Sequence, residues 1–206
     1  MDLFEAIRTT RAMRRLDPDR PVSDADVRTI LEAALKGPSG GNSQPVRWLV
    51  VRDRALKRGI QEIYQRGWAL SRRRYEASSS GPSPAVLGSA DHLAAHLHEA
   101  PVLIIACGET DGVKRDASVY PAVQNLMLAA RGLGLGTTLT TVHLTFEDEV
   151  KGLLGIPAEV QTFALVPVGY PLGRWGEAKR RPVEEVTFLD RWGEPYPAPS
   201  PAAGGA

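Results

Sequence analysis

The sequence predicts an α+β fold in which helices pack against one mixed sheet. Three observations lead to this class. Strand-like and helix-like segments mix without a strict alternation, one strand-like segment is apolar on both faces, and no internal repeat or linker divides the 206 residues. A chain of this length buries about 70% of its unfolded surface in a single core. We therefore expect one domain.

Composition argues against several classes of partner. The chain carries 25 basic and 24 acidic side chains, so it has no overall field to attract nucleic acid or an anionic membrane. Cys107 is the only cysteine, which leaves no disulfide and no cysteine-based metal cluster within one chain. Asp2 and Glu5 occupy the region where a signal peptide is basic, and no apolar run approaches the ~20 residues that span a bilayer. These features predict a cytoplasmic protein.

The first two elements are expected to be helices. In "DLFEAIRTTRAMRRL", Leu3, Phe4 and Ile7 are spaced to bury one side of a short helix, and "DPDRPV" ends it. Ser23 is the expected N-cap of the next helix, which has acidic residues in its first turn and apolar residues at helical spacing. Gly37 and the proline after it end this helix.

The middle of the chain predicts two strands and two helices. "VRWLVV" has the composition of a strand, and residues 54–77 follow with the pattern of a long polar helix. Helical spacing resumes over residues 87–99 after the loop "SSSGPSP". "PVLIIACG" is apolar on both faces, so it is expected in the middle of a covered sheet.

The last third predicts a deeply buried helix and two further strands. Apolar residues nearly encircle the helix in "SVYPAVQNLMLAARGLGLG". "TTLTTV" is expected to form a strand, followed by a helix capped by Thr145 and ended at Gly155. "VQTFALVPVG" is the last expected strand, and the final ten residues are expected to be disordered.

Basic residues gather after the first helix. Arg11 and Arg14 lie three residues apart, so their guanidinium groups can converge on one side of a turn, with Arg15 beside them. A planar guanidinium donates two parallel hydrogen bonds, which suits a phosphate. On spacing alone, a solvated basic face explains the same residues.

The stretch "GPSGGNSQP" is richer in glycine and polar residues than a plain turn requires. Adjacent glycines let the backbone approach a ligand closely, and Ser39, Asn42 and Gln44 supply hydrogen-bond donors and acceptors. The flanking prolines fix the ends of the loop. Its composition also fits a hairpin-like turn with polar filler.

Other patterns in the sequence do not predict a binding or catalytic site. "GLGLG" follows a helix and precedes a strand, the reverse of a dinucleotide-binding turn. His92 and His96 share a helix face without an acidic third ligand, so no metal site is expected. The basic run 72–74 is interpreted as a solvated face or part of a mobile segment over a pocket, and Cys107 as a core residue.

Four segments, "IRTTRAMRRL", "PSGGNSQP", "QNLMLAARGLGLGTTLTT" and "PVGYP...KRRPVEEV", follow one another in a specific order and spacing. In this the chain resembles the nitroreductase family of FMN-dependent oxidoreductases over residues 2–190. The resemblance implies a three-layer nitroreductase-like fold with a central mixed, mainly antiparallel sheet flanked by helices. It also implies a domain-swapped-type homodimer with two FMN sites at its interface. Residues 1–190 would form the FMN-binding domain, and residues 191–206 a partly disordered tail.

The resemblance implies a site built from both ends of the chain and from two subunits. Arg180 would return from the C-terminal segment to join the basic residues at the phosphate. The glycine-rich loop would reach the flavin bound mainly by the partner, and the segment after the buried helix would lie under the flavin ring, where a main-chain N–H approaches the reactive nitrogen. The implied cofactor-binding residues are Arg11, Ala12, Arg14, Pro38, Ser39, Gly40, Asn42, Gln44, Gln124, Leu139, Thr140, Thr141 and Arg180.

The chain departs from the family pattern at Ala12, where a hydroxyl is usual. Thr10 or a main-chain N–H must then replace that phosphate contact. Gln124 is expected to reach the cofactor in preference to Asn125, although a core amide that hydrogen-bonds the backbone is nearly as good an explanation.

The implied activity moves two electrons from NAD(P)H through FMN to a nitroaromatic, quinone or activated alkene. One open slot would serve both substrates in turn, which is a ping-pong mechanism. No dedicated proton donor and no metal ligand are expected, and residues 64–98 are the expected lid over the slot. Alternatives on the same scaffold are a dehydrogenase of a specific metabolite and a flavin-cleaving or dehalogenating enzyme. A non-catalytic flavin-binding carrier is the alternative from another class.

Overall fold

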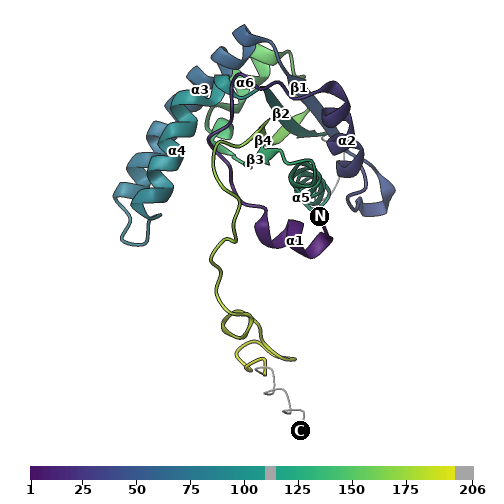
Figure 1. The fold of residues 1–206 in the computed structure, drawn as a ribbon, viewed down its shortest axis with the longest axis vertical. Coiled ribbons are helices and arrows are strands. Elements are labelled where there is room, and N and C mark those ends of the chain that lie inside the picture. Colours follow the sequence, from purple (N-terminus) through teal and green to yellow (C-terminus); the bar gives the residue numbers. More distant parts are fainter. Residues whose placement is uncertain (110–114, 198–206) are drawn as a thin grey trace.

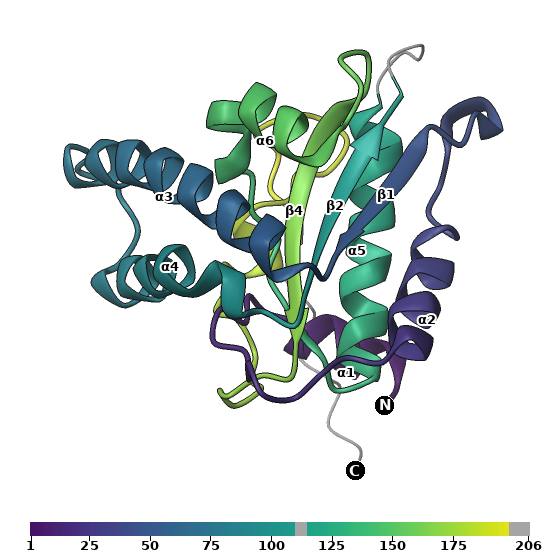
Figure 2. The ribbon, with the colours of Figure 1, turned by 90° about the horizontal axis from the view of Figure 1, so that it is seen from above.

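The computed structural model describes residues 1–109 and 115–197, which form a four-stranded sheet between two layers of helices (Figures 1 and 2). None of the helices in these ranges is both long and apolar enough to cross a membrane. The elements in chain order are α1 (Leu3–Thr9), α2 (Asp24–Ala34), β1 (Val46–Val51), α3 (Arg54–Glu76), α4 (Pro84–His96), β2 (Val102–Gly108), α5 (Asp116–Gly132), β3 (Gly136–Thr137), α6 (Glu147–Leu154) and β4 (Gln161–Gly169). Short 3₁₀ helices span Gly40–Asn42, Leu97–Glu99, Val142–Phe146 and Val183–Glu185.

The sheet has the strand order β1-β2-β4-β3, and its neighbouring strands are antiparallel. β2 is buried along its whole length and has a neighbour on each side, as its two apolar faces predict. Within the described ranges, the parallel pairing is a single bridge between Ala12 and Thr137 at the β3 edge. The prediction of a mixed, mainly antiparallel sheet is therefore confirmed.

Alternate residues of β2 face opposite helical layers, because side chains along a strand alternate between the two faces of the sheet. Ile104 packs in one core cluster with Ile30 of α2 and Leu126 of α5. Ile105 packs in a second cluster that includes Ile60 of α3. Figure 1 shows the corresponding arrangement, with α2 and α5 on one side of the sheet and α3, α4 and α6 on the other. Full burial of each such side chain contributes about 1.5–3 kcal/mol.

Helix ends follow the local signals, with one exception. The Ser23 hydroxyl caps α2 by accepting from the main-chain N–H of Asp26 at 3.0 Å. α6 ends as predicted, at Gly155 in the left-handed conformation with φ of 66°. The prediction that Thr145 caps this helix is wrong. That residue lies inside the 3₁₀ helix Val142–Phe146, which continues directly into α6.

The predicted strand "TTLTTV" is a strand only in part. β3 ends at Thr137, and a single bridge pairs Thr140 with Leu165 before the chain enters a 3₁₀ helix at Val142. Strand propensity is overridden here by packing, because the Val142 carbonyl lies close against Gly67 of α3, where a Cβ would be 2.8 Å away.

The apolar side of α1 is not buried within one chain. Leu3, Phe4 and Ile7 are 63%, 70% and 49% exposed, so their predicted burial is wrong for the isolated chain. The segment after β4 leads away from the body (Figure 1), and its Trp192 is 91% exposed. Clustered exposed apolar side chains mark interaction surfaces. The predicted domain boundary at residue 190 stays a prediction, and residues 198–206 of the predicted disordered end lie outside the described residues.

Candidate functional site

The basic segment, residues 11–15, is bonded to the β3 edge of the sheet. Ala12 bridges Thr137, and the main-chain N–H of Met13 donates to the Thr137 carbonyl at 2.8 Å. The buried Met13 side chain fixes the segment to the core. Ala12 is exposed and Arg14 is partly buried, so the predicted residues here lie along one edge of the sheet.

Arg14 carries a partly buried charge that no described side chain neutralises. Its guanidinium has no ion pair or hydrogen bond to any residue in 1–109 or 115–197. Burial lowers the pKa of Arg14, and the nearby Tyr64 opposes this effect. A guanidinium removed from water without a carboxylate is suited to receive an anion.

The C-terminal segment approaches Arg11, but not through Arg180. A guanidinium nitrogen of Arg11 lies 3.7 Å from the place that a Cβ on Gly176 would take. Arg180 is exposed, and its guanidinium donates to the carbonyl of the adjacent Lys179 at 3.0 Å. No contact described within one chain brings Arg180 to Arg11 or Arg14. The three-arginine phosphate clamp therefore stays a prediction.

The segment 139–141 presents main-chain donors away from the sheet. Thr140 exchanges two hydrogen bonds with Leu165, at 3.0 and 2.9 Å, so its N–H is already used. Neighbouring residues of such a pair point their N–H groups to the opposite side. Leu139 and Thr141 are exposed, and their N–H groups have no hydrogen bond to a described residue. Of the three predicted residues, these two can donate to a ligand.

Tyr64 of α3 contacts the segment 139–141, and the sequence did not predict this contact. Its hydroxyl lies 2.9 Å from Thr140 Oγ1, and burial raises the pKa of Tyr64, which keeps it neutral. A signal was present, because Ile60, Ile63, Tyr64 and Gly67 follow helical spacing and form the buried face of α3. That spacing shows burial but does not show which segment the hydroxyl meets.

The glycine-rich loop, residues 37–44, is held by its own hydrogen bonds. Ser39 Oγ accepts from the N–H of Gln44 at 2.8 Å, and the N–H of Gly40 donates to Ser118 Oγ of α5 at 3.3 Å. A cavity of about 110 Å³ is lined in part by Pro38, Ser39, Gln44 and Ser118. The loop is thus a folded structure next to a small hollow.

Its backbone is also strained. Asn42 and Gln44 adopt the left-handed region, with φ of 52° and 49°, beside Gly41 at 58°. A non-glycine residue there costs about 1–3 kcal/mol, and such strain concentrates where a ligand is bound. The exposed Asn42 and Gln44 side-chain amides have no partner among the described residues. The loop therefore presents free amides in a costly, fixed shape.

The loop and the basic segment lie at opposite corners of the sheet (Figure 2). The loop leads into Val46, which pairs with Gly108 on the β1 edge. The basic segment is bonded to Thr137, which pairs with Val168 on the β3 edge. Three strand spacings and about six residues along the strands separate these corners, which corresponds to roughly 25 Å. One chain does not bring both groups to one small ligand.

The two neighbouring amides of α5 have different roles. Asn125 Nδ2 donates to the Ala33 carbonyl at 3.4 Å, so Asn125 is the core amide that joins α5 to α2. Gln124 is exposed and its side chain has no hydrogen bond to a described residue. A ligand contact by Gln124 stays a prediction.

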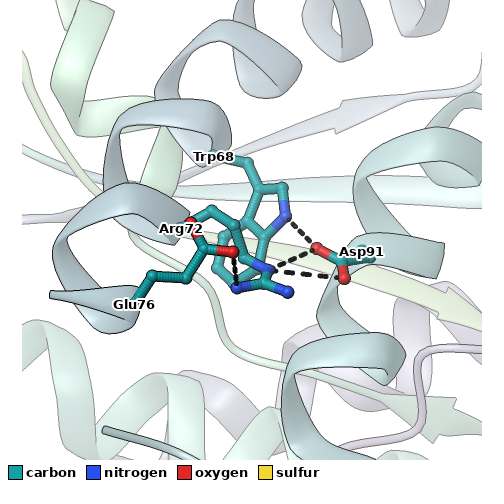
Figure 3. A network of polar contacts seen from close by, with 4 residues as sticks. All are labelled: Trp68, Arg72, Glu76 and Asp91. Carbon is teal, nitrogen blue, oxygen red and sulfur yellow. Dashed lines mark hydrogen bonds and ion pairs between the residues drawn. The ribbon is translucent and has the colours of Figure 1, made fainter. Parts of the chain in front are cut away.

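α3 and α4 form an antiparallel pair that projects from the sheet (Figure 2) and is joined by a polar network (Figure 3). Trp68 Nε1 donates to Asp91 Oδ1 at 2.8 Å, and Arg72 Nε donates to the same oxygen at 3.3 Å. Arg72 also pairs with Glu76 at 2.6 Å. The first arginine of the run 72–74 therefore stabilises the helix pair. The expected lid role of residues 64–98 stays a prediction.

His143 is a buried histidine two residues after the segment 139–141. Burial lowers the pKa of His143 to about 4, against an ordinary 6.5, and the opposing effect of Glu147 is smaller. Neither ring nitrogen has a partner in the part of the chain that the structure describes. Burial likewise raises the pKa of Cys107 to about 11, as suits a core thiol.

Comparisons with known proteins identify the family. The nitroreductase family model matches residues 7–170. A protein of Methanothermobacter thermautotrophicus inferred to be an NADH dehydrogenase/NAD(P)H nitroreductase is 34% identical over 93% of this chain and 88% of its own length. An iodotyrosine deiodinase of Thermotoga neapolitana is 31% identical over 82% of this chain and 88% of its own. The solved structure of oxidised iodotyrosine deiodinase bound to FMN and 3-iodo-L-tyrosine is 27% identical, with a TM-score of 0.73 over 93% of this chain and 98% of that one. This chain therefore belongs to the nitroreductase family.

Proposed function

We propose that two copies of this chain hold FMN between them and use NAD(P)H to reduce a nitroaromatic, quinone or activated alkene. The observation that carries the proposal is the placement of two ligand-ready groups at opposite corners of one sheet. A second copy related by twofold symmetry brings the loop of each chain to the basic segment of the other. The exposed apolar side chains of α1 and of the C-terminal segment provide surface for this contact.

The residues of the basic segment fit a flavin phosphate. Arg11 and Arg14 have no described counter-ion, and guanidinium groups form charge-assisted hydrogen bonds with phosphate oxygens. The Thr10 hydroxyl donates to the Ala6 carbonyl at 2.7 Å, so its proton is already used. A main-chain N–H is therefore the better replacement for the hydroxyl absent at Ala12.

The uncharged residues fit the rest of the cofactor. The free amides of Asn42 and Gln44 suit the polar edge of the ring or the polyol chain. The N–H of Leu139 or Thr141 suits a ring nitrogen, since that of Thr140 is bonded to Leu165. Tyr64 would orient this segment through Thr140.

When bound, the cofactor supplies the redox chemistry, in which a hydride is taken from NAD(P)H and two electrons pass to the acceptor in a separate step. The chain binds and orients the reactants. Within the described ranges no side chain is assigned as a dedicated proton donor, and the buried Tyr64 hydroxyl is engaged with Thr140 Oγ1 at 2.9 Å. An acceptor proton would then come from water.

The proposal is tested by adding NADH or NADPH anaerobically to the purified, FMN-loaded protein. Rapid loss of the yellow colour, followed by its return on addition of a quinone, is the expected result. Colour that persists would identify a flavin carrier without turnover. Failure of the protein to take up FMN would contradict both.

Reductive dehalogenation is a second candidate, favoured by the 31% identity to the Thermotoga neapolitana iodotyrosine deiodinase. In that reaction two electrons and a proton replace a carbon–iodine bond by a carbon–hydrogen bond and release iodide. Incubating the reduced protein with 3-iodo-L-tyrosine and measuring iodide decides between the two. Reoxidation by a quinone without iodide release supports the reductase.

A further inference from the structure

A basic cavity lies away from the residues discussed above. Its volume is about 440 Å³, and it opens where residues 18–21 and 98–101 meet the start of α3. Its charged lining residues are Asp19, Arg52, Arg54, Lys57, Arg58 and Glu99. Neither Arg11 nor Arg14 lines it, so the cavity does not share the proposed flavin phosphate contacts.

The burial of the Lys57 ammonium is the main evidence for a ligand in this cavity. Its side chain is buried, with the residue only 6% exposed, and its Nζ donates to the Ala100 carbonyl at 2.6 Å. No carboxylate of the described residues lies within 4.0 Å of this ammonium. Burial, and then repulsion by Arg54 and Arg52, lower the pKa of Lys57, and the smaller effect of the Asp53 carboxylate opposes them. A buried ammonium without an opposite charge is unfavourable, and two of its three protons remain available for a ligand.

The other charges around the cavity do not compensate Lys57. Arg52 pairs with Asp24 at 2.9 Å, and Glu99 Oε1 lies 2.9 Å from the ring nitrogen Nδ1 of His96, so neither carboxylate contacts Lys57.

Arg54 and Arg58 lie one turn apart on α3 and have no ion pair or hydrogen bond to any described residue. Among the lining residues, Lys57, Arg54 and Arg58 are three cations without an ion pair, and they share the cavity with two carboxylates, Asp19 and Glu99. The N-terminus of α3 adds nothing to this excess, because the Asp53 carboxylate caps it by accepting from the N–H of Leu56 at 2.9 Å. The lining therefore has an excess of positive charge, which an anionic ligand would neutralise.

We propose that this cavity is a binding site for a phosphate dianion, held by the Arg54 and Arg58 guanidinium groups and by Lys57. Two arginine forks and an ammonium match the several oxygens and the double charge of a phosphate. The dianion can come from free phosphate and phosphorylated metabolites, or from the 2′-phosphate that distinguishes NADPH from NADH. The proposal does not depend on flavin binding.

Inorganic phosphate is the first probe. Titration calorimetry on the full-length protein, at constant ionic strength set with sodium chloride, is expected to show saturable binding. The double variant Arg54→Ala/Arg58→Ala loses two charge-assisted bonds and should bind phosphate at least about tenfold more weakly. Both side chains lack partners in the described structure, so the variant is expected to fold normally.

Arg73→Ala/Arg74→Ala is the matched control, because it removes the same charge from exposed positions at the other end of α3. It should leave phosphate affinity unchanged. Equal affinity of wild type and Arg54→Ala/Arg58→Ala, or equal loss in the control, would overturn the proposal.

Lys57→Gln separates charge from packing. The glutamine amide can still donate to the Ala100 carbonyl, but it carries no charge. We expect weaker phosphate binding without loss of thermal stability, because the variant removes an uncompensated buried ammonium. Unchanged phosphate affinity would contradict the assigned role of Lys57.

The source of the dianion is identified by measuring how tightly NADH and NADPH bind. Their intrinsic fluorescence reports binding, and no turnover is needed. If phosphate competes with NADPH but not with NADH, and Arg54→Ala/Arg58→Ala weakens NADPH alone, the 2′-phosphate is the source. If the variant leaves both cofactors unaffected while its phosphate binding is lost, a free phosphate compound is the source. Either result identifies the ligand of the same cavity.

Discussion

The basic segment and the glycine-rich loop differ in charge and in how their backbone is held. The basic segment is cationic and is bonded to a sheet edge through regular main-chain hydrogen bonds. The loop, residues 37–44, carries amides and hydroxyls, and two non-glycine residues adopt the left-handed region. A charge attracts a phosphate over several ångströms, whereas an amide acts only in contact. Both segments are held in place, but only the loop, whose amides must meet a ligand in contact, is held with a strained backbone.

The largest expected effect comes from inactivating the basic segment in one variant and the glycine-rich loop in another, and then mixing the two variants. Arg14→Ala breaks the basic corner, and Gly41→Val breaks the loop, because valine is strained at φ of 58°. Each variant alone should have little reductase activity. If the two corners of a site belong to different chains, a refolded equal mixture should regain about a quarter of the wild-type activity, since half of the dimers contain one intact site of two.

The contrary outcome of that mixing experiment is also clear. If one chain forms a whole site, mixing restores nothing. Mixing each variant with itself is the control for the refolding procedure.

The next largest effect concerns the buried histidine of the 3₁₀ helix Val142–Phe146. The folded-state pKa of His143 is about 4, below the 6.5 of an unfolded histidine. Stability from this group is fully present above pH 6.5 and is lost as pH falls toward 4, by up to about 3 kcal/mol, because the unfolded state binds the extra proton. We expect urea unfolding to show that the free energy of unfolding of wild type falls relative to that of His143→Leu as pH is lowered from 6.5 toward 4. A difference independent of pH would contradict the assignment.

Arg14→Ala should weaken FMN binding by about 10- to 100-fold, since a charge-assisted hydrogen bond contributes about 1.5–3 kcal/mol. Fluorescence titration of the flavin measures the affinity. Arg74→Ala, at the exposed end of α3, is the control with the same charge change. Arg180→Ala sharpens the comparison, because an effect equal to that of Arg14→Ala would place the C-terminal arginine at the phosphate. Unchanged affinity in Arg14→Ala would remove this residue from the site.

The smallest expected effect is that of Tyr64→Phe. Loss of the 2.9 Å contact with Thr140 Oγ1 should lower the free energy of unfolding by about 0.5–1.5 kcal/mol. Chemical denaturation measures it, with Tyr75→Phe as the control, because Tyr75 is 41% exposed and its hydroxyl has no described hydrogen bond. A second expected result is a change in flavin redox potential without loss of flavin. No change in either quantity would exclude Tyr64 from positioning this segment.

Local signals predicted most of the elements. Strand β1 and the buried strand β2 follow from composition and from apolar runs, and the start of α2 follows from Ser23. The errors arise where distant packing decides. Thr145 does not cap α6 because a 3₁₀ helix continues directly into α6, and Leu3 and Phe4 stay exposed because none of the described elements covers that side of α1.

Sequence motifs predicted which loop residues belong to the candidate site, but they did not predict the backbone conformation of these residues or the contacts between distant segments. Asn42 and Gln44 were singled out from a loop whose composition exceeds that of a turn, yet their strained backbone has no signature in the sequence. Tyr64 and Lys57 were missed for a related reason. A helical pattern shows that a side chain is buried, but its partners, here Thr140 and the Ala100 carbonyl, come from segments far away in the chain.

The bare apolar side chains beyond β4, such as Trp192, have a thermodynamic consequence. Under the proposed pairing these side chains leave water only when another molecule arrives, so the folded state is governed by mass action. Resistance to heat would then rise with protein concentration and fall on dilution, and the smallest thermodynamic unit would be two molecules.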